Sequence, residues 1–250
     1  MKTRVLKLLK RLATVALFTP AMALAAGGVH LDEAPVSTDP ANLQRGARLF
    51  VNYCLNCHGA SAVRYNQLHK IGLDEKTITD NLLFTGDKTG DLMTVAMARE
   101  DAEAWFGTAP PDLSLIARAK ASASGSGADY LYTYLRSFYR DPNRPTGWNN
   151  TVFANVGMPH ALWDLQGEQT LKETSGADGH TVQEFVPGKP GSMTQEEYDR
   201  AVADLVSFLV WMGEPDAASR KTIGIFVLVF LAGFYVLTHA LGKNYWKDIH

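Results

Sequence analysis

The sequence predicts a mainly α-helical domain with long loops, followed by one C-terminal transmembrane helix. In several segments, apolar residues recur with helical spacing, while strand-like alternation is scarce. The segments between them are rich in glycine, proline, asparagine and serine, which predicts loops. Near the C-terminus, residues 222–241 carry no formal charge, and these 20 residues have the length that a helix needs to cross the hydrocarbon core.

The composition narrows the class of protein. Hydrophobic residues make up 46% and charged residues 20% of the 250 residues, which excludes a wholly disordered chain. The mean hydropathy of −0.11 is too low for a polytopic membrane protein. Two cysteines are too few for a disulfide-rich scaffold, and a formal net charge of −2 argues against a nucleic-acid-binding protein.

The N-terminus has the pattern of a secretory signal peptide. Residues 1–11 hold five basic residues and no acid, residues 12–18 are apolar, and small residues follow up to Ala26. We expect cleavage after Ala25, since the short apolar run and Pro20 disfavour an amphipathic anchor helix. Cleavage would leave 19 basic and 26 acidic residues, a formal net charge of −7, so the exported protein would attract a basic partner.

The exported region is expected to consist of helices joined by long loops. The expected helices are 39–54, a stretch around 91–106, a short helix 113–120, an aromatic-rich helix 129–139, and 194–212. Asp39-Pro40 starts the first of these helices, Asp112 caps the short one, and the capping box Thr194 to Glu197 opens the last. Residues 121–127, 141–157 and 167–192 are expected to form a flexible connector, a loop and a surface excursion. Loops of this length are uncommon in a compact domain unless a large rigid group supplies part of the core.

The cysteines indicate what that group is. Cys54, Cys57 and His58 form the pattern C-x-x-C-H, which is typical of c-type haem attachment. Two thiols one helical turn apart can bond to the two vinyl groups on one porphyrin edge, and the next residue can then place its imidazole on the iron. The alternatives fit less well: a redox dithiol belongs in a βαβ setting, a zinc site needs a second ligand pair, and a disulfide across two residues would stabilise little.

The ligand at the sixth iron position selects the chemistry. Met158 stands in Gly157-Met158-Pro159 within a predicted loop, where glycine allows a close approach to the ring and proline stiffens the chain. Packing of Met158 as an apolar side chain, or ligation by His160 or His69, remains open on spacing alone. Methionine with histidine leaves no open iron position, which suits electron transfer rather than oxygen or peroxide chemistry.

Longer blocks beyond the haem motif carry a resemblance to a known family. They are Gln44-Arg45-Gly46-Ala47, Pro110-Pro111-Asp112-Leu113-Ser114-Leu115-Ile116, Asp129-Tyr130-Leu131-Tyr132, Gly157-Met158-Pro159, residues 204–211, Glu214-Pro215, and the single C-terminal span with its short basic tail. Across nearly the whole predicted mature chain, these residues resemble the cytochrome c1 family, the haem subunits of the bacterial ubiquinol–cytochrome c oxidoreductase (the bc1 complex). The resemblance implies a cytochrome c-like haem domain with one covalent haem c.

The resemblance also implies roles for single residues. Cys54 and Cys57 would carry the haem, and His58 and Met158 would be its axial iron ligands. The segment 153–158 looks shorter than the usual family loop, and 167–192 has no clear counterpart. Pro111, Tyr130 and Phe153 would contact the haem ring. Lys120 would lie beside a haem propionate, at a position where the family usually has arginine, and Arg118 could share this role.

The implied function is electron relay from the Rieske iron–sulfur protein through the haem to a soluble cytochrome c. The chain would act as a subunit of the quinol-oxidising enzyme, with cytochrome b and the Rieske protein as partners in a dimeric complex, and with no catalytic acid, base or nucleophile. Two alternatives belong to other classes. One is an independent membrane-anchored cytochrome that serves another oxidase or reductase, and the other is a haem sensor or peroxidase with an open sixth position.

The expected organisation follows the two apolar ends of the chain. It comprises a signal peptide 1–25, a periplasmic haem domain 26–220, a transmembrane helix 221–241 in the bacterial inner membrane, and a cytoplasmic tail 242–250. Two basic residues flank the span on each side, so the positive-inside rule does not set its orientation. Export of the N-terminal part sets it instead.

Overall fold

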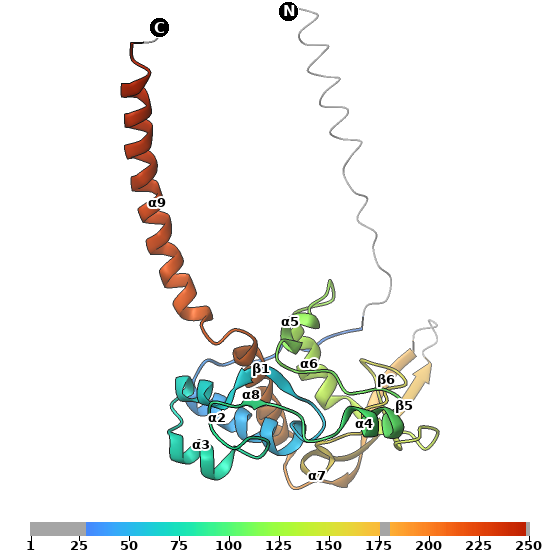
Figure 1. Cartoon of the computed structure of the whole chain (residues 1–250). Coiled ribbons are helices and arrows are strands. Elements are labelled where there is room, and N and C mark those ends of the chain that lie inside the picture. Colours follow the sequence, from blue (N-terminus) through green and yellow to red (C-terminus); the bar gives the residue numbers. More distant parts are fainter. Residues whose placement is uncertain (1–28, 176–180, 249–250) are drawn as a thin grey trace, which may run out of the picture. The chain divides into compact units, whose positions relative to one another are not determined.

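The structure is a computed structural model, and it describes residues 29–175 and 181–248 (Figure 1). The predicted signal peptide and its cleavage site lie outside these residues. The described part is mainly helical, which confirms the predicted fold class, and it also contains three two-stranded antiparallel sheets. In chain order its elements are α2 (Pro40–Leu49), η1 (Phe50–Cys54), β1 (Ala60–Arg64), η2 (Tyr65–Ile71), α3 (Glu75–Asn81), β2 (Leu92–Met93), α4 (Arg99–Phe106), α5 (Ile116–Ala119), α6 (Gly127–Arg136), β3 (Phe138–Arg140), β4 (Trp148–Asn150), α7 (Trp163–Gln166), β5 (Gly167–Ser175), β6 (Thr181–Pro190), α8 (Gln195–Gly213) and α9 (Ala217–Tyr245).

The helix α8 is the centre of the main core, and α2, α5 and α6 pack against it. Its predicted capping box is present, because the Thr194 and Glu197 side chains each accept a hydrogen bond from the other residue's backbone N–H. The contact between α2 and α8 is close: a Cβ added to Gly46 would lie 2.1 Å from the carbonyl oxygen of Asp204. Glycine therefore allows the helix that leads to the haem motif to lie directly on the central helix.

The structure corrects several predicted helix bounds. In the stretch 91–106 only α4 is helical, since residues 92–93 pair with β1 as β2. The predicted helix 113–120 shortens to α5, because the Asp112 carboxylate accepts the Ser114 N–H in a turn and caps no helix. The aromatic helix ends at Arg136, and β3 begins at Phe138 and pairs with β4, which lies inside the predicted loop 141–157.

The segment 167–192 is largely exposed, in agreement with the predicted surface excursion, but it forms the antiparallel hairpin β5–β6, which was not predicted. Leu171 lies opposite Phe185, and Lys172 lies opposite Glu184. Most described residues of the hairpin are exposed. A strand with two solvated faces shows little apolar–polar alternation, so the pattern on which strand prediction rests is missing here.

The C-terminal helix α9 is long and apolar enough to cross a membrane. The candidate span is Ser219–Tyr245, and none of its most apolar window is buried within the chain. An apolar helix that is exposed on all sides needs a non-aqueous environment. The predicted span 221–241 lies within it, which supports a membrane-anchored protein.

Candidate haem site

The C-x-x-C-H motif follows a continuous helical segment. α2 runs directly into the π-helical turn η1, and π-turns are frequent at functional sites. The backbone N–H groups of Cys57 and His58 both donate to the carbonyl oxygen of Cys54, at 3.0 and 2.8 Å. This turn brings two sulfur atoms and an imidazole together on five residues that are anchored in the main core.

Cys54 and Cys57 form no disulfide with each other, and burial affects both thiols. Burial raises the pKa of the Cys54 thiol to about 12, and burial also raises the pKa of Cys57. A redox dithiol would instead need a lowered thiol pKa. The environment therefore disfavours the thioredoxin-like alternative.

The His58 imidazole is in the form that binds a metal. Its Nδ1 lies 2.8 Å from the carbonyl oxygen of Pro111, and because a carbonyl can only accept, Nδ1 carries the proton. Burial lowers the pKa of His58, although the Pro111 bond and the nearby Asp112 carboxylate oppose this shift. The ring is thus neutral at pH 7, with the Nε2 lone pair available to iron.

The Pro-Pro-Asp-Leu-Ser block runs alongside the haem motif and holds it. The Asp112 carboxylate accepts hydrogen bonds from both the backbone N–H and the hydroxyl of Ser61, each at 2.7 Å. Burial alone would raise the pKa of Asp112, but bonds from Ser114 and Ser61 hold it below its usual value. Two further bonds join the segments, from Leu113 N–H to Gly59 O at 2.7 Å and from Ala62 N–H to the Ser114 hydroxyl at 3.0 Å.

Met158 lies on an irregular loop beside a second, smaller buried cluster. This cluster consists of Phe138, Trp148 and Val156, and Met158 and Tyr134 pack against it. The Tyr134 hydroxyl donates to the Met158 sulfur at 3.4 Å. Since Tyr134 packs against the main core as well, it joins the two clusters.

The two histidines that competed with Met158 lie in different surroundings, since His69 is exposed and His160 is buried. The buried His160 ring stacks on Phe138 with 4.8 Å between centroids, and burial lowers its pKa to about 4. Both ring nitrogens of His69 have partners, Nδ1 with the Leu73 carbonyl at 2.8 Å and Nε2 with Glu75 at 3.0 Å. The hydrogen bonds of His69 disfavour it as the sixth ligand, whereas the buried Nε2 of His160 has no hydrogen-bond partner among the described residues.

The remaining predicted haem contacts gather around one lysine. The Lys120 ammonium group lies 4.9 Å from the ring centroid of Tyr130 and 5.9 Å from that of Phe153. Tyr130 in turn stacks on Tyr134, the partner of Met158, at 5.9 Å. Phe153 is 52% exposed, an apolar ring that a bound macrocycle could cover. Arg118 instead forms an ion pair with Glu214, which leaves Lys120 as the better candidate for a propionate.

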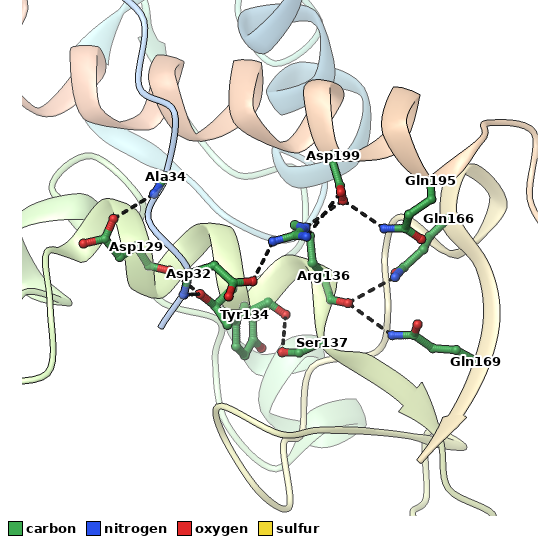
Figure 2. A network of polar contacts seen from close by, with 11 residues as sticks. Asp32, Ala34, Asp129, Tyr134, Arg136, Ser137, Gln166, Gln169, Gln195 and Asp199 are labelled. Carbon is green, nitrogen blue, oxygen red and sulfur yellow. Dashed lines mark hydrogen bonds and ion pairs between the residues drawn. The ribbon is translucent and has the colours of Figure 1, made fainter. Parts of the chain in front are cut away.

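A polar network fixes α6, the helix that carries Tyr130 and Tyr134 (Figure 2). Arg136, at its end, pairs with Asp199 of α8 at 2.7 Å and with Asp32 at 2.8 Å. Its carbonyl oxygen accepts from the side chains of Gln166 and Gln169, both at 3.1 Å. Figure 2 shows these partners converging from three distant segments of the chain.

Two reduced thiols, a neutral imidazole, a thioether and a cation among aromatic rings are a donor set that fits a covalently bound haem. Sequence reasoning missed the role of Tyr134 beside the sulfur, and it missed the polar side chains of the Met158 loop. The pair Asn149-Asn150 was the available signal, because asparagine in a loop often bonds to nearby backbone.

The chain is similar to known proteins over most of its length. A model of the Cytochrome C1 family matches residues 31–89 and 85–249. A cytochrome c1 from Allochromatium vinosum is 45% identical over 96% of this chain and 98% of its own length, and one from Rhodospirillum rubrum is 28% identical over 84% of this chain and 83% of its own. A Nitrosomonas europaea protein named ammonia monooxygenase gamma subunit is 50% identical over 98% of this chain and 100% of its own length.

Proposed function

The chain belongs to the cytochrome c1 family, and from that premise we propose that it is the haem c electron-transfer subunit of a cytochrome bc1 complex. It receives electrons from the Rieske iron–sulfur protein and passes them to a soluble cytochrome c. The observation that carries this proposal is the neutral His58 ring, held by Pro111 directly after two free thiols.

The residues of the site would hold one haem c. Cys54 and Cys57 would form the thioether bonds, and His58 and Met158 would bind the iron from opposite faces. When bound, the haem supplies an iron that changes between the ferrous and ferric states. Lys120 would neutralise a propionate as a point charge, while Pro111, Tyr130 and Phe153 would contact the ring.

The residues of the site would support electron transfer in which no covalent bond of a substrate is made or broken. If His58 and Met158 both bound the iron, these nitrogen and sulfur ligands would leave no site for oxygen or peroxide. The bond from His58 to Pro111 fixes the orientation of the imidazole, and burial disfavours the charged, doubly protonated ring. No residue of the site has to act as an acid, base or nucleophile.

The same proposal gives the chain its topology and partners. Residues 1–25 would be a cleaved signal peptide, residues 26–220 would lie in the periplasm, and α9 would anchor the chain with the tail 242–250 in the cytoplasm. Cytochrome b and the Rieske protein share the complex, which would be dimeric. The net charge of −7 predicted after cleavage would steer a basic cytochrome c toward the exposed part.

Purification of the tagged chain from its own membranes tests the proposal. We expect cytochrome b and Rieske subunits to co-purify. The pyridine haemochrome spectrum of the tagged chain, after its separation from the other subunits, should correspond to one haem with two thioether bonds. Co-purification with subunits of a membrane monooxygenase, the complex suggested by the name of the Nitrosomonas relative, would contradict the partner assignment. Recovery of the chain alone, or carbon monoxide binding by the native ferrous form, would favour one of the two alternative classes.

A further inference from the structure

The loop that carries Met158 is folded by the two asparagines at the end of β4. The side-chain oxygen of Asn150 accepts the backbone N–H groups of Val152 and Phe153 at 2.9 and 3.1 Å. The side-chain oxygen of Asn149 accepts the N–H of Asn155 at 2.8 Å. Both asparagines are buried, so these bonds take the place of a regular backbone ladder.

Asn150 also forms a hydrogen bond with Tyr134, the tyrosine that contacts Met158. The Asn150 amide nitrogen donates to the carbonyl oxygen of Tyr134 at 2.8 Å. The Tyr134 hydroxyl donates to the Met158 sulfur. Asn150 therefore ties the start of the loop to the helix whose side chain contacts the end of the loop.

Arg144 holds the far end of the loop. Its Nη2 donates to the carbonyl oxygen of Asn155 at 2.8 Å, and its Nη1 donates to the Asn155 side-chain oxygen at 3.2 Å. Asn155 has a φ of +61°, and no other non-glycine residue in the described part of the chain has a positive φ. Asparagine tolerates this left-handed conformation better than most residues. After this reversal Val156 is buried in the small cluster, and Met158 follows two residues later.

We propose that Arg144, Asn149, Asn150 and Asn155 form a loop clamp that positions the Met158 sulfur against the haem iron. The inference rests on the proposed function, in which Met158 is the sixth ligand. The cluster beside the loop has only three fully buried apolar residues, so packing alone restrains the sulfur weakly. Hydrogen bonds to a charged donor supply the missing restraint.

The clamp makes a spectroscopic prediction that a purely stabilising role would not make. In the purified full-length, haem-loaded protein, Arg144→Gln and Asn155→Ala should each increase, by about tenfold or more, the fraction of molecules in which the Met158 sulfur is not bound to the iron. This fraction is measured by the ferric near-infrared sulfur-to-iron band and by carbon monoxide binding to the ferrous form. Asn155→Gly should stay within about twofold of the wild type, because glycine adopts a positive φ and keeps the carbonyl that Arg144 binds.

Two reference variants make the outcome decisive. Arg64→Gln is the matched control, since Arg64 also donates to a loop carbonyl, that of Gly90, and it should leave the band unchanged. Met158→Ala should abolish the band; an unchanged band there would refute the proposed ligand itself. If Met158→Ala removes the band while Arg144→Gln and Asn155→Ala keep the wild-type value, the clamp is refuted alone. If Arg144→Gln fails to fold, Asn155→Ala decides, and a wild-type sulfur-to-iron band in that variant would overturn the proposal.

Discussion

The two sides of the haem site are held by different physical means. The Cys54–His58 side lies at the end of a helix whose residues pack in the main core, and it is joined to the 111–114 segment largely through its backbone. The Met158 side lies on an irregular loop beside three buried apolar residues, and polar side chains hold it. Packing thus holds one of the proposed iron ligands, while hydrogen bonds hold the other.

This difference separates two kinds of mutational effect. A change in volume near α2 or α8 acts on the whole core, which tolerates little overpacking. A change at the Met158 loop removes one or two hydrogen bonds and leaves the core intact. We therefore expect damage on the first side to unfold the chain or prevent haem attachment, and damage on the second side to alter iron ligation in a folded protein.

The largest expected effect comes from removing both sulfur atoms. Cys54→Ala together with Cys57→Ala should eliminate covalent haem completely, because no other cysteine exists to replace them. Met158→Ala should keep the haem attached, since that residue contributes no thioether bond. Haem staining after denaturing electrophoresis measures the difference. Haem lost equally from both variants would mean that the two sides are not independent.

The packing of α2 on α8 predicts the next largest effect. Gly46→Ala should lower the free energy of unfolding by about 3 kcal/mol, since its Cβ would meet the backbone of Asp204. Gly90→Ala is the matched control, with no atom within 4 Å of its added Cβ, and it should change the free energy by less than about 0.5 kcal/mol. Denaturant titration of the detergent-solubilised chain measures both. Equal values would show that helix packing does not restrain this side.

Acid should weaken the first side through Asp112. The folded-state pKa of its carboxyl lies below the unfolded value of about 3.9. Its contribution is therefore fully present above that value and is lost as the pH falls through the folded pKa. Asp112→Asn should cost about 1 kcal/mol at pH 7, since a neutral amide replaces a carboxylate that accepts several hydrogen bonds. The free energies of unfolding of the wild type and Asp112→Asn, measured between pH 6 and 2, should converge in acid. A constant difference between the two free energies would exclude this linkage.

The smallest effect belongs to the Tyr134 hydroxyl. Tyr134→Phe removes the donor to the Met158 sulfur, so the sulfur should give more electron density to the ferric iron. The reduction potential should fall by about 30 mV, roughly 0.7 kcal/mol. Tyr65→Phe removes a buried hydroxyl of the main core that pairs with Thr85, and it should reduce stability without changing the potential. A redox titration of both variants tests whether the two hydroxyls differ in this way.

Local patterns explain which elements could be predicted from the sequence. α8 begins at a capping box and repeats apolar residues on one face, and both signals lie within its own residues. The C-x-x-C-H pentapeptide and the span in α9 are equally local. The β5–β6 hairpin escaped prediction because its exposed faces lack alternation.

The parts that could not be predicted depend on residues far apart in the chain. The partner of His58 is a carbonyl 53 residues away, and the donor to Met158 lies on another helix. The clamp is shorter in range, with a sequence separation of 11 between Arg144 and Asn155, but it requires a left-handed residue that no sequence pattern marks. The fold class could be inferred and is confirmed, the axial ligands stay a prediction, and the groups that contact those predicted ligands required coordinates.

The seating of α2 on α8 has a consequence for the order of assembly. Arg45, next to Gly46, pairs with Asp204 at 2.6 Å across a separation of 159 residues. The haem-bearing segment therefore cannot complete its packing until nearly all of the chain ahead of the anchor has emerged. Under the proposed export, this interval leaves both thiols accessible to the attachment machinery while translocation is still under way.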